Sequence, residues 1–199
     1  MSRFFFFLGV ISILAAGYLI WQRYSPTRLA FNAMVLPATK DRTEIVPTSI
    51  EIEDLGLALS IISEELIDNT WPMSNRGVVY LANTPRPGDR GNSILYGHNW
   101  PNILGRLTRI KPGATISIGF NNGERRMFIV EYTQEVTPDQ THILASTDDR
   151  RITLYTCTGF FDQKRFVVTA IAEEESTAFL PNIKMIQIIL MIDAFFFIS

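Results

Sequence analysis

The chain has 199 residues, of which 47% are apolar and 19% charged, and its formal net charge is −2. This length fits one domain with appendages, and a chain without a basic excess gives no indication of nucleic-acid binding. The single cysteine excludes an intramolecular disulfide and a cysteine-based zinc cluster.

The first predicted element is a membrane-spanning helix over residues 4–21. These residues carry no charge, and as a helix they extend about 27 Å, close to the hydrocarbon thickness of a bilayer. Trp21 and Tyr24 stand where interfacial aromatic side chains are common. We expect an uncleaved anchor. A cleaved signal peptide, with small residues at Ala15-Ala16-Gly17, is the alternative, and both send the following domain across the membrane.

Two segments are predicted to lie outside the folded domain. Residues 22–44 contain Pro26, Pro37 and mixed charges, which is typical of a linker. Residues 181–199 form a hydrophobic tail in which Asp193 would be costly at the centre of a bilayer. For this tail a second membrane segment, a helix on the membrane surface and no fixed role are all open, so the chain is single-pass or two-pass.

The remaining residues, 45–178, form the predicted domain, and their pattern is mostly β. Residues 50–62 are apolar without a clean period and fit a strand or a helix. The turn Asn121-Asn-Gly123 predicts a hairpin, and residues 101–107 alone indicate a short helical turn. Short strands between Gly- and Pro-rich turns are typical of a sandwich or barrel. The predicted strands are 77–82, 93–96, 115–120, 126–132, 151–156 and 165–171.

Cys157 directly follows the predicted strand 152–156, so we expect its side chain at a strand end. Arg165 opens the next strand after a loop of residues 158–164. If the two strands pair, this loop brings the guanidinium close to the sulfur. Arginine keeps its charge and has fixed donors, which suits stabilising a negative carbonyl oxygen. Taken singly, a buried apolar cysteine and a surface arginine are the more ordinary interpretations.

His98 is one of two histidines and follows a predicted strand, in the run Tyr96-Gly-His-Asn-Trp100. We expect Gly97 to allow an unusual backbone there. Two strand ends would then present His98 and Cys157 at one rim of the sheet. Imidazole and thiol have ordinary pKa values of about 6.5 and 8.5, so modest shifts bring each into a working range. His142 lies in a polar stretch and is interpreted as an ordinary loop residue.

Together these motifs resemble the sortase family over roughly residues 45–172. The short spacing from cysteine to arginine resembles the compact class E or F-like sortases more than the calcium-dependent housekeeping type. The matching pieces are Gly97-His98, Thr153-Leu-Tyr-Thr-Cys157, Arg165, Pro87-Gly-Asp-Arg-Gly-Asn92 and Lys111-Pro-Gly113.

The resemblance implies an all-β fold, an eight-stranded sortase-type β-barrel with short helices, behind the N-terminal transmembrane helix. It implies a cysteine transpeptidase whose Cys157 attacks the Thr carbonyl of an LPxT-like sorting signal and forms a thioacyl intermediate. His98 would exchange protons with the leaving and incoming amines, and Arg165 would hold the substrate and the oxyanion. Asn99 and Thr156, the latter through its hydroxyl or its backbone, are the predicted substrate-binding residues.

The implied partners are secreted proteins with an LPxT-like C-terminal sorting signal and an amine acceptor. The acceptor amine belongs to a peptidoglycan precursor or to a protein lysine, as in a pilin. The resemblance implies no metal and no organic cofactor, and it places the catalytic domain on the extracytoplasmic side. Anchoring, pilus polymerisation and hydrolysis all stay open.

Within the linker, Leu36-Pro-Ala-Thr-Lys40 looks like such a sorting signal with Lys in place of the final Gly. A pattern of four positions with one free site arises readily by chance, so coincidence is the first interpretation. The alternative is a tethered pseudo-substrate.

Three other classes of protein are alternatives to a sortase. A papain-like protease places its cysteine before its histidine, whereas His98 precedes Cys157 here. An L,D-transpeptidase carries a Ser-His-Gly-Cys run, which this sequence lacks. A catalytically inactive, membrane-anchored β-barrel that binds or scaffolds is the remaining alternative. The sequence contains Cys157, His98 and Arg165 together, and an inactive relative would usually lack one of them.

Overall fold

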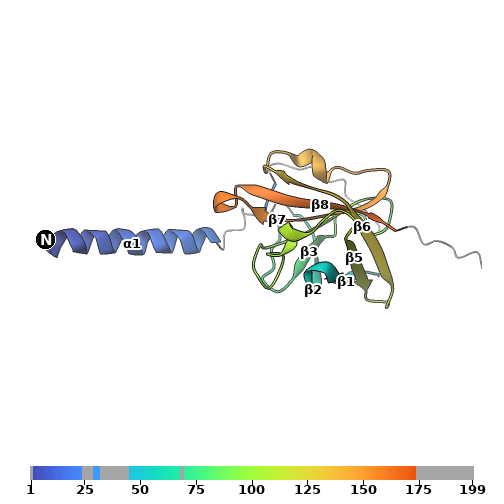
Figure 1. Cartoon of the computed structure of the whole chain (residues 1–199), viewed down its shortest axis with the longest axis horizontal. Coiled ribbons are helices and arrows are strands. Elements are labelled where there is room, and N and C mark those ends of the chain that lie inside the picture. Colours follow the sequence, from blue (N-terminus) through green and yellow to red (C-terminus); the bar gives the residue numbers. More distant parts are fainter. Residues whose placement is uncertain (1, 24–28, 32–44, 68–69, 174–199) are drawn as a thin grey trace, which may run out of the picture.

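The computed structural model describes residues 2–23, 29–31, 45–67 and 70–173 (Figure 1). Most of the predicted linker, Leu36–Lys40 and the tail 181–199 lie outside these residues. The described part contains one α-helix, α1 (Ser2–Arg23), and eight strands: β1 (Pro47–Ile52), β2 (Leu57–Glu64), β3 (Val78–Leu81), β4 (Gly91–Gly97), β5 (Thr115–Phe120), β6 (Arg125–Val136), β7 (Arg150–Thr158) and β8 (Lys164–Ala172). Short 3-10 helices stand between strands: η2 (Glu53–Leu55), η3 (Leu107–Arg109), η4 (Thr141–Leu144) and η5 (Phe160–Asp162).

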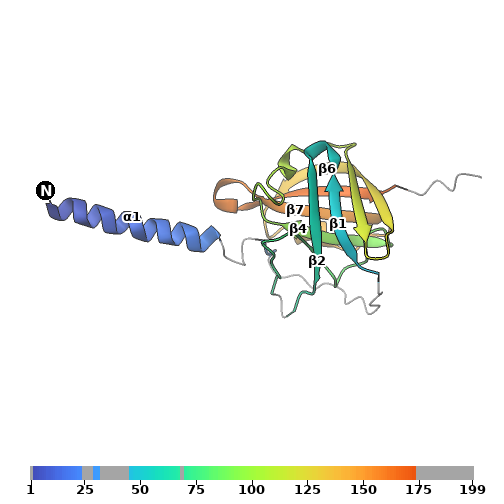
Figure 2. The same ribbon diagram turned by 90° about the horizontal axis from the view of Figure 1, so that it is seen from below.

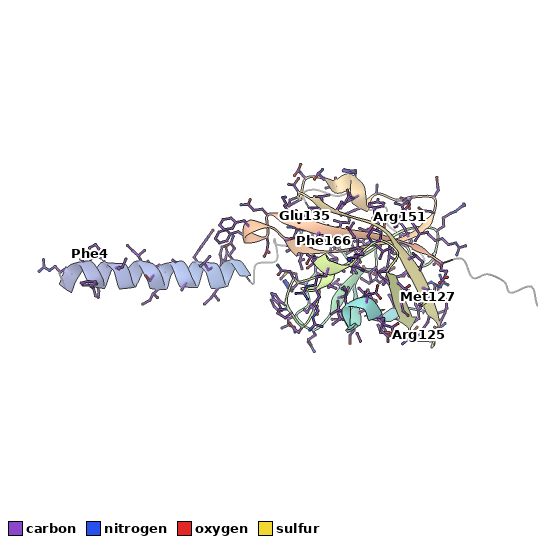
Figure 3. The ribbon with its side chains drawn as sticks, viewed as in Figure 1. Phe4, Arg125, Met127, Glu135, Arg151 and Phe166 are labelled. Carbon is purple, nitrogen blue, oxygen red and sulfur yellow. The ribbon has the colours of Figure 1, made fainter. Side chains whose placement is uncertain are left out.

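The helix α1 is apolar on every side. Its segment Arg3–Gln22 is long and apolar enough to cross a membrane, and none of it is buried against the rest of the described chain. Figure 3 shows side chains, Phe4 among them, standing out all round the helix. Such a helix suits lipid on all faces. It is compatible with a single-pass anchor, and an N-terminal signal sequence meets the same criteria.

The eight strands form a closed barrel in the order β1-β2-β3-β4-β7-β8-β6-β5. The pairs β2–β3 and β4–β7 are parallel, and the other neighbours are antiparallel. In Figure 2 the strands curve round the barrel, with β1 and β2 side by side. Closure leaves no sheet edge unpaired. The predicted eight-stranded barrel with short helices is confirmed.

The ambiguous segment 50–62 is mostly strand. β1 and β2 pair antiparallel, and η2 with Gly56 at φ 59° connects them. The helical turn interrupts the two-residue alternation of the strands, which explains why no single period was visible. The hairpin at residues 121–123 is confirmed between β5 and β6. β6 continues past the predicted end at Tyr132 because a register shift lets it keep pairing with β8.

Apolar side chains gather in two layers, one inside the barrel and one on its outside. The inner layer takes residues from all eight strands. The outer layer lies on β3, β4, β7, β8 and the C-terminal end of β6, and we call this surface the outer face. Along β7 the two alternate, with Ile152 and Leu154 inside and Tyr155 and Cys157 outside. The outer face is covered by Leu29, Phe31, Trp71 and Leu144.

Candidate active site

The predicted site residues lie on adjacent strands at one end of the barrel. Cys157 is directly opposite Arg165 in the β7–β8 ladder, where Cα atoms of antiparallel partners lie about 4.5–5.5 Å apart. His98 follows Gly97, whose partner in the β4–β7 ladder is Thr156, the residue before Cys157. The strand register therefore brings His98, Cys157 and Arg165 into neighbouring positions.

Cys157 was expected directly after a strand. It lies inside β7 instead. The pairing of β7 with β8 continues to Thr158 opposite Lys164, which shortens the connecting loop to residues 159–163. The thiol is 3% exposed and belongs to the layer on the outer face, not to the barrel interior. Residues lying over that face, rather than the barrel wall, therefore separate the sulfur from solvent.

Arg165 is 2% exposed, so it is not an ordinary surface arginine. Its Nη1 donates to the carbonyl oxygens of Asp162 at 2.9 Å and Lys164 at 3.1 Å. Its Nη2 donates to the carbonyl oxygen of Ala30 at 2.9 Å. Its Nε is buried and has no hydrogen-bond partner among the described residues. Buried donors are rarely left unpaired, and an exception calls for an explanation such as function.

His98 is buried, and its ring stacks on Trp100 with 4.3 Å between centroids and 8° between planes. Its carbonyl oxygen accepts the Leu104 N–H at 3.0 Å. The expectation of an unusual backbone at Gly97 is wrong, since its φ is not positive. A Cβ at Gly97 would lie 3.1 Å from Ile103 Cγ2 and 3.2 Å from Leu104 Cδ1. Glycine therefore allows Ile103 and Leu104 to pack closely against the backbone there.

Asn99 and Thr156 hold the surrounding elements together. The Asn99 amide donates to Asp162 Oδ1 at 2.9 Å, which ties the residue after His98 to the loop before Arg165. The Thr156 hydroxyl is buried and donates to the carbonyl oxygen of Gly97 at 2.8 Å, joining β7 to β4. Because that hydroxyl is engaged here, a substrate contact of Thr156 remains a prediction for its backbone, and Asn99 as a substrate ligand remains a prediction too.

Sequence reasoning missed Tyr155, which lies beside Cys157 on the outer face. Its ring stacks on Tyr96 with 5.2 Å between centroids. Its hydroxyl donates to the carbonyl oxygen of Leu29 at 3.1 Å. Burial raises the pKa of Tyr155 well above its ordinary value, so the hydroxyl keeps its proton and stays a donor. The signal available in the sequence was the two-residue spacing from Cys157, which puts both side chains on one face of a strand.

A further prediction concerns a histidine away from the three strand ends. His142 lies exposed on η4, in agreement with its interpretation as an ordinary loop residue. Across the described ranges, no group of three or more His, Cys, Asp or Glu side chains is placed to hold a metal ion.

Comparison with known proteins identifies the class to which this barrel belongs. The sortase domain model matches residues 50–173, more than half of the chain. The chain belongs to the sortase family, whose members are cysteine transpeptidases. A comparison with curated proteins finds no match.

Solved structures of sortases share the fold. Sortase A from Corynebacterium diphtheriae is 24% identical with a TM-score of 0.58, covering 82% of this chain and 86% of that chain. Sortase C1 from Streptococcus agalactiae is 23% identical with a TM-score of 0.55, covering 69% and 72%. Sortase A from Listeria monocytogenes is 24% identical with a TM-score of 0.54, covering 66% and 89%. These proteins are called sortases A and C, and the class E or F-like subtype stays a prediction.

Proposed function

We propose that this chain is a transpeptidase that cleaves an LPxT-like sorting signal and transfers the acyl group to an amine. The observation that carries the proposal is the pairing of Cys157 with Arg165 across β7 and β8, where the buried Arg165 Nε has no hydrogen-bond partner within the described part of the chain. A nucleophile beside a fixed cationic donor is the arrangement that acyl transfer requires. The adjacent His98 supplies a group that both donates and accepts a proton near neutral pH.

The reaction has two halves, each with a balanced transfer. The Cys157 thiolate attacks the Thr carbonyl carbon, and the negative oxygen that forms receives a hydrogen bond from Arg165 Nε. The C–N bond then breaks, and His98 protonates the departing amine, leaving a thioacyl enzyme. An incoming amine loses its proton to His98, attacks the thioester carbon and releases Cys157. Dividing the reaction in this way lets one thiol both cut and join.

The proposed donors are secreted proteins with an LPxT-like C-terminal signal, and the acceptor is a peptidoglycan precursor or a lysine of another protein. This proposal is supported by family membership and by α1, which is long enough to cross a membrane. It places the barrel on the extracytoplasmic side, tethered at the surface where secreted substrates emerge.

The test uses the full chain in detergent micelles with a library of LPxT-like peptides. Mass spectrometry is expected to detect a thioacyl adduct, which can form only on Cys157 because the chain has one cysteine. Cys157→Ala is expected to form no adduct while circular dichroism shows an unchanged fold. His98→Ala is expected to lose nearly all turnover. Equal peptide cleavage by Cys157→Ala and the wild type would contradict the proposal. No adduct and no cleavage with the wild type would favour the inactive scaffold.

A further inference from the structure

Phe160 and Phe161, which we call the aromatic pair, stand in the loop between β7 and β8. Phe160 is 79% exposed and Phe161 is 49% exposed. Within the described part of the chain, no other large apolar side chain is as exposed as Phe160, those of α1 included. The two ring centroids lie 4.4 Å apart at 84°, so the rings form one apolar projection. Single exposed apolar side chains are ordinary, whereas adjacent ones among polar residues can mark an interaction site.

The backbone of this loop is held in an uncommon conformation. Phe161 and Asp162 have φ angles of 50° and 56°, and a bulky residue keeps a left-handed backbone only where surrounding contacts hold it. Those contacts lie on the polar side of the loop. The Asp162 carbonyl oxygen accepts Arg165 Nη1 at 2.9 Å, and Asp162 Oδ1 accepts the Asn99 amide at 2.9 Å. The loop therefore keeps polar groups bonded to the barrel while both rings stand in solvent.

The aromatic pair lies on the side of the barrel to which α1 is tethered. Arg165, which binds the Asp162 carbonyl, also donates through Nη2 to the carbonyl oxygen of Ala30 at 2.9 Å. The chain from Arg23, where α1 ends, to Ala30 reaches at most about 25 Å when fully extended. Figures 1 and 2, two views at right angles, both show the loop between β7 and β8 extending from the barrel toward α1. A bilayer that contains α1 therefore lies within reach of this loop.

We propose that the aromatic pair inserts into the interfacial region of the lipid bilayer that α1 crosses. Apolar rings are buried favourably at the boundary between headgroups and acyl chains. Such insertion needs no anionic headgroup, and the neighbouring Lys164 already pairs with Glu135 at 3.1 Å. The barrel is then held to the membrane at two points, α1 and the loop. This second point fixes the ends of β7 and β8, which carry Cys157 and Arg165, in one orientation toward the bilayer surface.

The experiment measures the depth of the loop with a nitroxide spin label on the full chain, reconstituted in phosphatidylcholine vesicles. Cys157→Ala removes the one cysteine, so adding Gln163→Cys gives a single label beside an intact aromatic pair. Asn122→Cys is the matched control, because the β5–β6 turn lies at the end of the barrel opposite to Arg165. The readout is the rate of collision with oxygen, which concentrates in lipid, divided by that with a water-soluble nickel chelate. We expect this ratio to be about tenfold higher at residue 163 than at residue 122, because only the loop lies at the membrane interface.

A second variant separates insertion of the rings from nearness imposed by the tether. Phe160→Ser with Phe161→Asn removes both rings, and asparagine tolerates the left-handed backbone at residue 161. We expect the ratio at residue 163 to fall to that at residue 122, and the label at residue 122 to keep its spectrum because the barrel stays folded.

Two results overturn the proposal: equal ratios at residues 163 and 122 with the rings present, or a high ratio at residue 163 that persists without them. In the first case, immobilisation of the label at residue 163 by an LPxT-like peptide would assign the aromatic pair to peptide binding instead. The measurement needs no turnover, so failure of the transpeptidase proposal leaves its result unaffected.

Discussion

At the scale of single residues, Arg165 is distinguished by where its donors point. Its Nη1 donates to two carbonyls within three residues of it in sequence, and its Nη2 donates to a distant carbonyl. Its Nε has no hydrogen-bond partner among the residues that the structure describes. The planar guanidinium keeps these donors in a fixed relation, which a lysine ammonium on a flexible stem cannot reproduce. The charge of residue 165 and the geometry of its donors are therefore separable by substitution.

We predict that Arg165→Lys lowers kcat for peptide cleavage by about 10²–10³-fold, the usual effect of losing one oxyanion donor. The measurement is the rate of amine release from a fluorogenic LPxT-like peptide. Arg151→Lys is the control, because Arg151 lies on the same strand as Cys157 but pairs with Asp149. Near wild-type activity in Arg165→Lys would show that charge alone suffices.

The motif residues could be predicted from the sequence because each stands at or beside the end of a strongly patterned strand. Tyr155 and the burial of residues 29–31 could not. Tyr155 has the same apolar character as any strand residue, and only its two-residue offset from Cys157 indicates the shared face. Leu29 and Phe31 stand in a segment with the composition of a linker. Their burial is a tertiary contact with β7 and β8, and no local periodicity reports such contacts.

At the scale of elements, Asn92 connects β4 to β7 and to the segment that ends η4. Its amide nitrogen donates to the carbonyl oxygens of Ile143 and Ala145, each at 3.1 Å. Its amide oxygen accepts the Thr153 hydroxyl at 2.7 Å. The parallel β4–β7 pair is the one that places His98 beside Cys157. Asn92 thus contributes to the site from the opposite end of β4.

We predict that Asn92→Ala lowers the free energy of unfolding by about 1–3 kcal/mol, because it leaves buried polar groups without partners. Thermal unfolding of the full chain in detergent, followed by circular dichroism, measures the change. Asn122→Ala is the control, since Asn122 is an exposed turn residue and water can replace its contacts. A loss no larger than that of the control would mean that β4 and β7 do not depend on this side chain.

Element boundaries were predictable where alternation was regular and the turns were strong. β3, β5 and β8 lie within one residue of their predicted ends. The prediction missed the last two residues of β7, Cys157 and Thr158, because their strand character comes from pairing with β8, not from their own pattern. β1 and β2 could not be recognised as two strands because η2 breaks the alternation between them. Cross-strand pairing therefore decides where a strand ends when the local sequence pattern does not.

At the scale of the whole molecule, the tether between α1 and residues 29–31 is short. From Arg23, where α1 ends, to Leu29 there are six residues, which reach at most about 20 Å when fully extended. If α1 spans the membrane, residues 29–31 and the neighbouring strand ends therefore stay near the bilayer surface. In Figure 1 the loop between β7 and β8 lies on the side of the barrel that faces α1. Such a tether would keep the candidate site close to the membrane.

The anchor itself can be tested by a charge placed at the middle of α1. An arginine at the centre of a spanning helix costs about 2.5–3.5 kcal/mol on insertion scales. We therefore expect Ile13→Arg to move part of the protein from the membrane pellet to the soluble fraction after an alkaline carbonate wash. Phe4→Arg is the matched control, because it lies beside Arg3 at the helix end, where a long side chain reaches the interface. Equal retention of both variants would contradict a spanning helix, and release of the wild type would favour a cleaved signal sequence.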